Sequence, residues 1–245
     1  MSEGYRGDFQ WLVERPIAHR GLHDGIRHVP ENSLPAAQAA IEAGYAIECD
    51  VQMSASGTPH VFHDAVTDRL TDRQGSFETL SDPEIANLRL AGTDAGIPTV
   101  EEFLDLVDGR VPIVMELKGR DPQRDAEFLA KLSPLVAAYR GKLALMSFDH
   151  WLIDAMLAMR PADRPIGLTA EGVEEPVLAA HRAIFSLGCD FVSYNLAHLP
   201  NGFVDWVRTD RGAPVISWTV KTADEAAHSV RHADQITFEG FAPQQ

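Results

Sequence analysis

Eight short apolar runs, separated by segments with helical patterning, are the sequence feature that most restricts the fold. Each run has the length and apolar character of a β-strand. The runs cover residues 16–20, 46–51, 111–118, 143–148, 165–169, 190–195, 214–220 and 233–238. Strands that alternate with helices and are apolar on both faces form parallel sheets covered by helices. The pattern therefore predicts an α/β protein.

Helix start and stop signals lie between these runs. A capping side chain precedes apolar residues spaced three or four apart in four segments, at Asn32-Ser33, Thr99 with Glu102, Asp149, and Thr222 with Glu225. Gly44 and Gly188 follow two of the expected helices, as a left-handed residue at a helix end does. The segments between the strands are therefore predicted to be helical.

Eight strand–helix repeats in 245 residues fit a closed (β/α)₈ barrel, the TIM barrel. The main competitor, a doubly wound open sheet, normally carries a glycine-rich phosphate turn after its first strand. No GxGxxG or Walker pattern occurs here. Residues 64–98 break the rhythm, because they are polar, punctuated by glycine and too long for a simple loop. We predict a small insertion there, on the barrel rim after the second strand.

Acidic residues lie near the ends of two consecutive predicted strands. Glu48 and Asp50 are near the end of the second strand, and Glu116 and Lys118 near the end of the third. Side chains alternate along a strand, so the members of each pair point the same way. Buried carboxylates need compensating charge, and three oxygen donors suit Mg²⁺ or Ca²⁺. We predict a divalent cation at Glu48, Asp50 and Glu116; the alternative is ion pairing with Arg20 and Lys118 alone.

Two histidines follow apolar stretches near these acidic residues. His19 precedes Arg20 and Gly21, whose missing side chain allows a tight turn with the backbone close to a ligand, and His63 follows the stretch PHVF. Two histidines that face each other across a ligand can act as general acid and general base, because they titrate near neutral pH. We predict this role for His19 and His63. Three other histidines lack such a setting and are expected in loops or at the rim: His23, His28 and His60.

Charge and cysteine usage restrict the partners and the compartment. The 36 acidic and 21 basic residues give a formal net charge of −15, which repels nucleic acid and anionic membranes, so we expect no nucleic-acid partner. The first 20 residues lack the apolar core of a signal peptide, and we expect neither export nor a membrane span. Cys49 and Cys189 lie in separate apolar runs, as reduced thiols of a cytoplasmic protein do. The oligomeric state leaves no signal in the sequence.

Short motifs follow one another in order along most of the chain. They are HRG (19–21), PENS (30–33), IECDV (47–51), HD (63–64), RLT (69–71), IPTVEE (97–102), MELK (115–118), SFD (147–149) and SWTV (217–220). Together they resemble the glycerophosphodiester phosphodiesterase family. The resemblance implies a metal-dependent hydrolase. It also implies that residues 1–245 form a single catalytic TIM-barrel domain, with the small insertion at about residues 64–98. It also implies cleavage of glycerophosphodiesters to sn-glycerol 3-phosphate and an alcohol such as choline, ethanolamine or glycerol.

The same resemblance implies roles for individual residues. The cation would be held by Glu48, Asp50 and Glu116, the acid–base pair would be His19 and His63, and the phosphate oxygens would be bound by Arg20 and Lys118. Trp218, at the carboxyl end of a strand, is expected to pack against the glycerol or the alcohol. The chain departs from the family pattern at Lys221, where asparagine is usual, and at Phe238-Glu239, where an Ile-Thr-Asp-like turn is usual. These departures bear on substrate detail more than on the chemistry.

Two alternative functions from other classes remain open. A glycoside hydrolase also uses two carboxylates on a barrel. Its transition state carries no phosphate charge, so it would not need a histidine pair, an arginine and a lysine around the carboxylates. A non-catalytic barrel that binds phosphodiesters or a protein partner has no use for a proton shuttle. The residues therefore favour a phosphodiester hydrolase.

Overall fold

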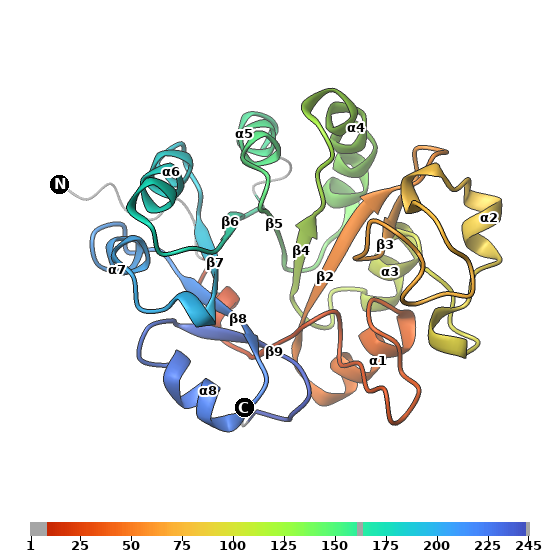
Figure 1. Cartoon of the computed structure of the whole chain (residues 1–245), viewed down its shortest axis with the longest axis horizontal. Coiled ribbons are helices and arrows are strands. Elements are labelled where there is room, and N and C mark those ends of the chain that lie inside the picture. The colour runs from red at the N-terminus through yellow and green to blue at the C-terminus, as the bar shows by residue number, and fades with distance from the viewer. Residues whose placement is uncertain (1–8, 161–163, 244–245) are drawn as a thin grey trace.

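Eight parallel strands close into a barrel at the centre of the molecule (Figure 1). The structure, a computed structural model, describes residues 9–160 and 164–243. The barrel strands are β1 (Ile17–Ala18), β2 (Ala46–Met53), β4 (Ile113–Leu117), β5 (Leu143–Ser147), β6 (Ile166–Ala170), β7 (Phe191–Asn195), β8 (Val215–Val220) and β9 (Gln235–Phe238). β1 pairs in parallel with both β2 and β9, which closes the sheet on itself. The predicted TIM barrel is confirmed.

Helices connect the barrel strands and surround them (Figure 1). They are α1 (Leu34–Ala43), α3 (Val100–Val107), α4 (Pro122–Ala138), α5 (His150–Met159), α6 (Glu175–Phe185), α7 (Gly202–Thr209) and α8 (Ala223–Ser229). A shorter helix, α2 (Asp82–Ala86), lies outside this ring. Short 3₁₀ turns complete the described elements: η1 (Gln10–Val13), η2 (Phe77–Thr79), η3 (Leu90–Gly92) and η5 (Leu196–His198).

Helices begin directly after the predicted cap residues in all four segments, and in three of them the side chain caps the first turn. The side chains of Ser33, Thr99 and Thr222 each accept a backbone hydrogen bond in the first turn of α1, α3 and α8. Asp149 is the N-cap residue of α5 as predicted, but its side chain makes no capping hydrogen bond. Its carboxylate instead accepts a hydrogen bond from the Gly119 N–H at 2.8 Å, because the loop after β4 runs next to it.

The two glycines expected at helix ends behave differently. Gly44 ends α1 in the left-handed region, with φ +77°, as predicted. Gly188 has φ +129° and lies beyond the residue that ends α6, Ser186. It therefore serves the turn into β7 rather than the helix end itself.

Side chains of the barrel strands alternate between two apolar layers. Ala46 of β2 and Val114 of β4 belong to a cluster inside the barrel. Cys49 and Leu117, from the same strands, belong to the larger cluster between the barrel and the helices. Two residues after Ala46 and Val114, the next inward-facing positions are the acidic residues Glu48 and Glu116. The alternation predicted from the strand period is confirmed.

A short strand absent from the prediction precedes the insertion. β3 (Pro59–Val61) pairs antiparallel with β2. It carries His60, which is buried and lies 3.4 Å from a carboxylate oxygen of Asp82. The expectation of a loop or rim position for His60 is therefore wrong, since three residues between two polar turns are too few to show strand periodicity.

Residues 64–98 build a lobe with an apolar cluster of its own (Figure 1, where α2 marks it). Besides Phe62, the cluster consists of Leu70, Phe77, Leu80, Ile85, Leu88, Leu90 and Ile97. In the sequence these residues stand singly among polar ones, which hides the cluster. We call this segment the lobe.

Both cysteines are free and buried, as predicted for core thiols. Burial, with a contribution from Asp190, raises the pKa of Cys189 to about 12, so this thiol stays protonated. Within residues 9–160 and 164–243, no helix is both long enough and apolar enough to pass through a bilayer.

Candidate active site

A cavity at the carboxyl ends of the barrel strands is lined by all eight residues singled out from the sequence. They are His19, Arg20, Glu48, Asp50, His63, Glu116, Lys118 and Trp218. The sequence did not single out the other lining residues, which are Met146, Phe148, Thr169, Ser193, Thr219 and Thr237. The carboxyl ends of the strands form the face on which TIM-barrel enzymes bind their substrates.

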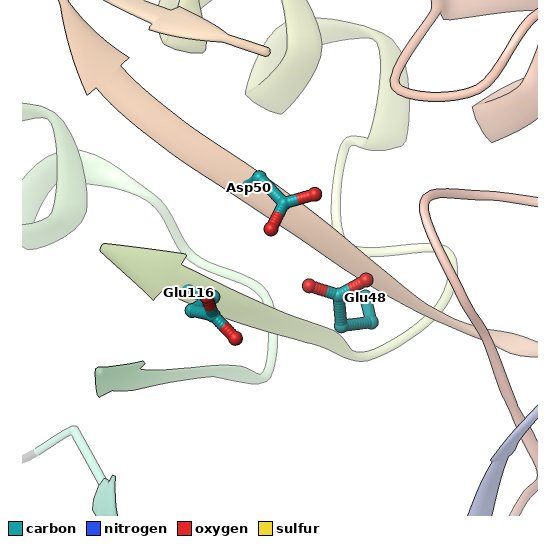
Figure 2. A group of neighbouring side chains, drawn as sticks. All are labelled: Glu48, Asp50 and Glu116. Carbon is teal, nitrogen blue, oxygen red and sulfur yellow. The ribbon is translucent and has the colours of Figure 1, made fainter. Parts of the chain in front are cut away.

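Three carboxylates gather at one point of this cavity (Figure 2). Oxygens of Glu48, Asp50 and Glu116 all lie within 4.8 Å of one another, and the three side chains are buried. β2 and β4 are parallel neighbours whose register places Asp50 opposite Glu116. Mg²⁺ and Ca²⁺ bind carboxylate oxygens at about 2.0–2.6 Å, so oxygens this close can share one ion.

Two cationic side chains contact the same carboxylates. Lys118 Nζ lies 2.9 Å from Asp50 Oδ1 and also pairs with Glu116. Arg20 Nε lies 3.3 Å from Asp50 Oδ2. The ion pairs of the alternative interpretation are thus present, but they centre on Asp50. Glu48 accepts a hydrogen bond from the Arg20 backbone N–H at 2.9 Å, and the cluster keeps an excess of negative charge.

The pKa values of the three carboxylates report this imbalance. Burial, reinforced by repulsion from Asp50 and Glu116, raises the pKa of Glu48 well above its ordinary range. Burial also raises the pKa of Glu116 to about 7, although Lys118 acts in the opposite direction. Against the effect of burial, the charges of Lys118 and Arg20 hold the pKa of Asp50 below its usual value. The donor set therefore fits a divalent cation, whose charge would compensate Glu48 and Glu116.

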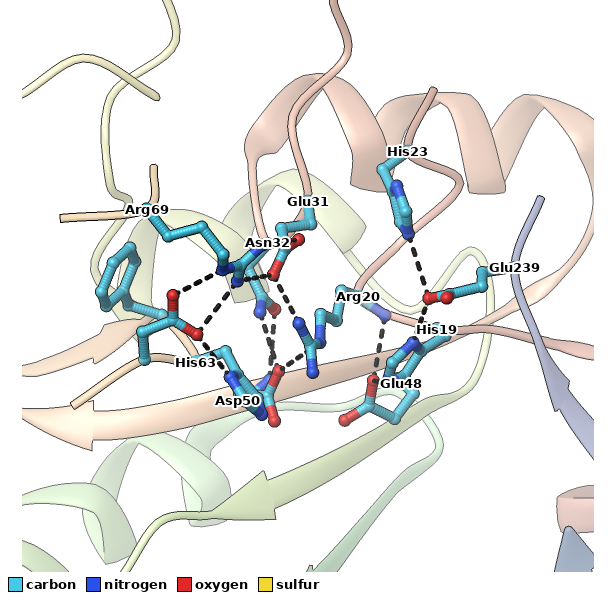
Figure 3. A network of polar contacts seen from close by, with 12 residues as sticks. His19, Arg20, His23, Glu31, Asn32, Glu48, Asp50, His63, Arg69 and Glu239 are labelled. Atoms are coloured by element: carbon cyan, nitrogen blue, oxygen red, sulfur yellow. Dashed lines mark hydrogen bonds and ion pairs between the residues drawn. The ribbon is translucent and has the colours of Figure 1, made fainter. Parts of the chain in front are cut away.

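His19 lies beside this cluster with both ring nitrogens near carboxylates. Its Nδ1 is 2.7 Å from Glu239 Oε2, and its Nε2 is 3.9 Å from Glu48 Oε2 (Figure 3). The other oxygen of Glu239 lies 2.8 Å from Lys221 Nζ. Lys221 and Glu239, the two charged residues among the departures from the family pattern, therefore contact each other next to His19.

His63 begins a chain of ion pairs that returns to the carboxylate cluster (Figure 3). Its Nδ1 lies 2.7 Å from Asp64 Oδ1. Arg69, from the lobe, donates to Asp64 and, with two nitrogens, to Glu31. Glu31 in turn accepts from Arg20 Nη1 at 2.6 Å. Burial lowers the pKa of His63, so its neutral form is favoured.

The turn after β1 positions Arg20. Arg20 has φ +55° and Gly21 has φ +78°, which bends the chain sharply at the strand end. A Cβ on Gly21 would lie 2.8 Å from the Cβ of Ala36. The glycine therefore allows both the tight turn that was predicted and the close approach to α1.

Trp218 forms an aromatic wall of the cavity together with Phe148. Their ring centroids are 5.5 Å apart and their planes meet at 84°. Phe148 is 39% exposed, which is unusual for a phenylalanine and places it at the cavity mouth. Within the described residues, the buried indole Nε1 of Trp218 has no hydrogen-bond partner. The wall thus offers both an apolar surface and an unused donor.

The residues that support the two histidines and Arg20 were not predicted from the sequence. They are Glu31, Asp64, Arg69 and Glu239. The first three stand inside the motifs PENS, HD and RLT, and Glu239 stands in the departure after β9. Their position in or beside these motifs was the signal that could have drawn attention to them, but the spacing of residues in the sequence does not predict their contacts with His19 or His63. Two of the histidines expected in loops or at the rim differ in their surroundings: His28 is exposed, as expected, while His23 Nε2 lies 3.6 Å from Glu239.

Comparisons with known proteins point to one family. The sequence profile of the Glycerophosphoryl diester phosphodiesterase family matches residues 19–236. Glycerophosphodiester phosphodiesterase 1 of Mus musculus is 26% identical over 253 residues, covering 88% of this chain and 74% of the mouse protein. A glycerophosphodiester phosphodiesterase of Caldanaerobacter subterraneus is 29% identical over 178 residues, covering 65% of this chain and 68% of the relative.

A solved structure shows the same fold. A phosphodiesterase of Oleispira antarctica, in complex with the product sn-glycerol 3-phosphate, superimposes with a TM-score of 0.80. Its sequence is 22% identical, and the match covers 93% of both chains. The fold of this chain thus has a close structural counterpart in this similar protein.

Proposed function

This chain belongs to the glycerophosphoryl diester phosphodiesterase family and is an enzyme that hydrolyses glycerophosphodiesters, and we propose that the barrel cavity is its active site. The observation that carries the proposal is the meeting of three carboxylates, two histidines, Arg20 and Lys118 in one cavity. Family membership does not favour a glycoside hydrolase or a non-catalytic barrel. We also propose that the chain acts as one catalytic domain, with residues 64–98 as an insertion.

Glu48, Asp50 and Glu116 would hold one divalent cation, Mg²⁺ or Ca²⁺. When bound, the ion supplies positive charge that offsets the negative charge of the phosphodiester and of its transition state. The raised pKa values of Glu48 and Glu116 support this assignment, because both carboxylates lack sufficient compensating charge in the protein itself.

Arg20 and Lys118 would bind the non-bridging phosphate oxygens. Both are cations at the wall of the cavity, where burial strengthens their interaction with an anion. The guanidinium of Arg20 is held by Glu31 at 2.6 Å, so its position is fixed before substrate arrives. Charge that grows on the phosphoryl oxygens in the transition state is thereby stabilised.

His19 and His63 would act as the acid–base pair. One imidazole takes the proton of the attacking hydroxyl as the new P–O bond forms, and the other gives a proton to the leaving alkoxide as the old P–O bond breaks. Each histidine has a carboxylate on Nδ1, so that Nε2 is the nitrogen available to the substrate. Trp218, with Phe148, would pack against the glycerol or the leaving alcohol.

The nucleophile would be the substrate's own glycerol 2-hydroxyl, which gives a cyclic phosphate that water then opens. Two successive proton transfers suit a histidine pair, because the residue that acts as acid in the first step can act as base in the second. Incorporation of ¹⁸O together with trapping of the cyclic product tests this order. Direct attack of water, with no cyclic species, would rule it out.

The products would be sn-glycerol 3-phosphate and an alcohol such as choline, ethanolamine or glycerol. The product complex of the Oleispira protein supports the first of these. The net charge of −15 supports a small-molecule substrate and no nucleic-acid partner. Two buried free thiols support a reducing, cytoplasmic compartment.

A product screen by ³¹P NMR tests the proposal. Glycerophosphocholine, glycerophosphoethanolamine and bis-glycerophosphate are each incubated with protein and Mg²⁺, with Ca²⁺, or with EDTA. We expect sn-glycerol 3-phosphate to form with at least one of the two ions and not with EDTA. Absence of turnover with every substrate and ion would contradict the assignment of this cavity as an active site.

A further inference from the structure

The closure of the barrel brings Glu239 next to His19. β1 and β9 are parallel neighbours whose register pairs Ala18 with Phe238, and the His19 N–H donates to the Phe238 carbonyl at 2.9 Å. The residues that follow these partners, His19 and Glu239, therefore emerge side by side at the cavity. Their side chains meet at 2.7 Å between Nδ1 and Oε2. The contact is a consequence of strand register and not of loop flexibility.

The chemistry of this contact fixes where the ring carries its proton. An ionised carboxylate only accepts hydrogen bonds, so Nδ1 of His19 must be the donor. The hydrogen bond from His19 and the nearby His23 and Lys221 hold the pKa of Glu239 well below its usual value, so the carboxylate is ionised at neutral pH. In the neutral ring Nε2 then has no proton. Nε2 is also the nitrogen on the side of Glu48, at 3.9 Å.

The second histidine has an equivalent arrangement built from different elements. Asp64 lies at Nδ1 of His63, at 2.7 Å, and Arg69 lies on the far side of Asp64. Glu239 and Lys221 repeat this order at His19, with 2.8 Å between Lys221 Nζ and Glu239 Oε1. Each imidazole is thus followed by a carboxylate and then by a cation. The repetition, from separate strands and loops, indicates that the order matters to both histidines.

We propose that Glu239 is the positioning residue of His19, which orients its ring and keeps the proton on Nδ1 so that Nε2 serves the substrate. Lys221 holds Glu239 from the other side. It is a weaker support, because its side chain is 60% exposed and water can replace it. This inference rests on the proposed role of His19, and it assigns Glu239 no contact with substrate.

The direct test is the position of the proton, read from the ring ¹⁵N chemical shifts of His19 in the presence of Mg²⁺. The His19→Ala variant identifies the signals. We expect a proton on Nδ1 in the wild type, whether the ring is neutral or cationic. In Glu239→Ala the neutral ring should lose this preference and shift toward the form with the proton on Nε2. A neutral wild-type ring with the proton on Nε2, or spectra unchanged by Glu239→Ala, would overturn the inference.

A kinetic cycle tests the consequence for turnover of glycerophosphocholine. We expect Glu239→Ala to lower kcat by roughly 10–100-fold, as loss of a residue that orients a ligand does, with little change in KM. In the His19→Ala background the same substitution should have no further effect, because there is no ring left to position. Lys221→Met should lower kcat by only about 2–3-fold.

Glu171 provides the matched control. It directly follows β6 as Glu239 follows β9, but it accepts a hydrogen bond from Asn195, at 2.9 Å. Glu171→Ala should keep wild-type kcat in both backgrounds. A full loss on Glu239→Ala in the His19→Ala background would overturn the positioning role while leaving the proposed function intact. Absence of turnover by the wild type would instead contradict the proposed function, and this inference with it.

Discussion

Glu48 and Asp50 differ in the charge around them although they are two residues apart on one strand. Asp50 is surrounded by Lys118, Arg20 and an amide hydrogen bond from Asn32 at 2.8 Å. Glu48 has a single backbone hydrogen bond, from Arg20. Asp50 therefore remains ionised without a metal, whereas Glu48 depends on one. Of these two carboxylates, Glu48 is therefore expected to contribute more to the affinity of the site for the ion.

Substitution of Glu48 tests this dependence. We expect Glu48→Gln to lower kcat by at least about 10² and to abolish calorimetrically detectable binding of Mg²⁺ or Ca²⁺, since a neutral amide cannot compensate the ion. The control is Glu101→Gln, an exposed position on α3, which should behave as wild type. Unchanged ion affinity in Glu48→Gln would contradict the assignment.

Removal of a catalytic histidine should be costly even though the cavity stays intact. We expect His19→Ala to lower kcat by about 10²–10⁴, the usual contribution of acid–base catalysis. His28 is exposed, and His28→Ala should keep full activity. The measurement is steady-state hydrolysis of glycerophosphocholine. If His19→Ala keeps the wild-type kcat, His19 is not part of the acid–base pair.

At the scale of elements, the lobe contributes Asp64 and Arg69 to the surroundings of the site. Arg69 bridges Asp64, which contacts His63, and Glu31, which contacts Arg20. Arg69 thus connects His63 with Arg20, the arginine for which we propose phosphate binding. The lobe acts on the chemistry through this bridge.

Loss of this bridge should affect turnover without unfolding the lobe. We expect Arg69→Ala to lower kcat by roughly 10-fold or more, because both carboxylates lose the cation that orients them. The matched control is Arg73→Ala. Arg73 belongs to the same lobe, and its ion pair with Glu84, at 2.9 Å, stays within it. Equal activities of the two variants would contradict a role for Arg69 beyond that of a surface ion pair.

Packing of α6 on α7 and β7 gives the protein a pH-dependent stability unrelated to catalysis. His181 of α6 lies against the rings of Phe203 and Tyr194. Burial, followed by repulsion from His150, lowers the pKa of His181 to about 4. The unfolded chain has a histidine pKa of about 6.5. The unfolded chain therefore gains a proton before the folded one does, so stability is highest above pH 6.5, falls as the pH drops from 6.5 to 4 and changes no further below 4.

Urea unfolding between pH 4 and 8 measures this contribution. Between pH 6.5 and 4 we expect the free energy of unfolding to fall by on the order of 2 kcal/mol more in the wild type than in His181→Gln. The packing lost in the variant lowers stability equally at every pH. His28→Gln should keep the wild-type pH dependence. Parallel curves for wild type and His181→Gln would show that His181 is not the group responsible.

At the scale of the whole molecule, the sequence predicts best what depends on local period and order. The alternation along β2 and β4 placed Glu48, Asp50 and Glu116 on the inner side, because a strand has a fixed period of two. The order of strands and helices predicted the barrel for the same reason. β3 was not predicted, since three residues are too few to show a period. The apolar cluster of the lobe was not predicted either, because its residues stand singly among polar ones.

Contacts between segments far apart in the chain could not be predicted in this way. His19 and Glu239 are 220 residues apart, and their contact requires the closure of β1 on β9. Arg69 reaches Glu31 across 38 residues because the lobe folds back over the turn after β1. Propensity and spacing describe neighbours in sequence, whereas these contacts depend on three-dimensional packing. The positioning residues therefore emerged only from the structure.

The central claim is that three carboxylates at the mouth of the barrel hold one divalent ion beside the two histidines. Anomalous diffraction from crystals soaked in Mn²⁺, which accepts the same oxygen ligands as Mg²⁺ and Ca²⁺, measures this directly. We predict one strong peak, at about 2.0–2.6 Å from oxygens of Glu48, Asp50 and Glu116. A peak elsewhere, or none at these residues, would contradict the account.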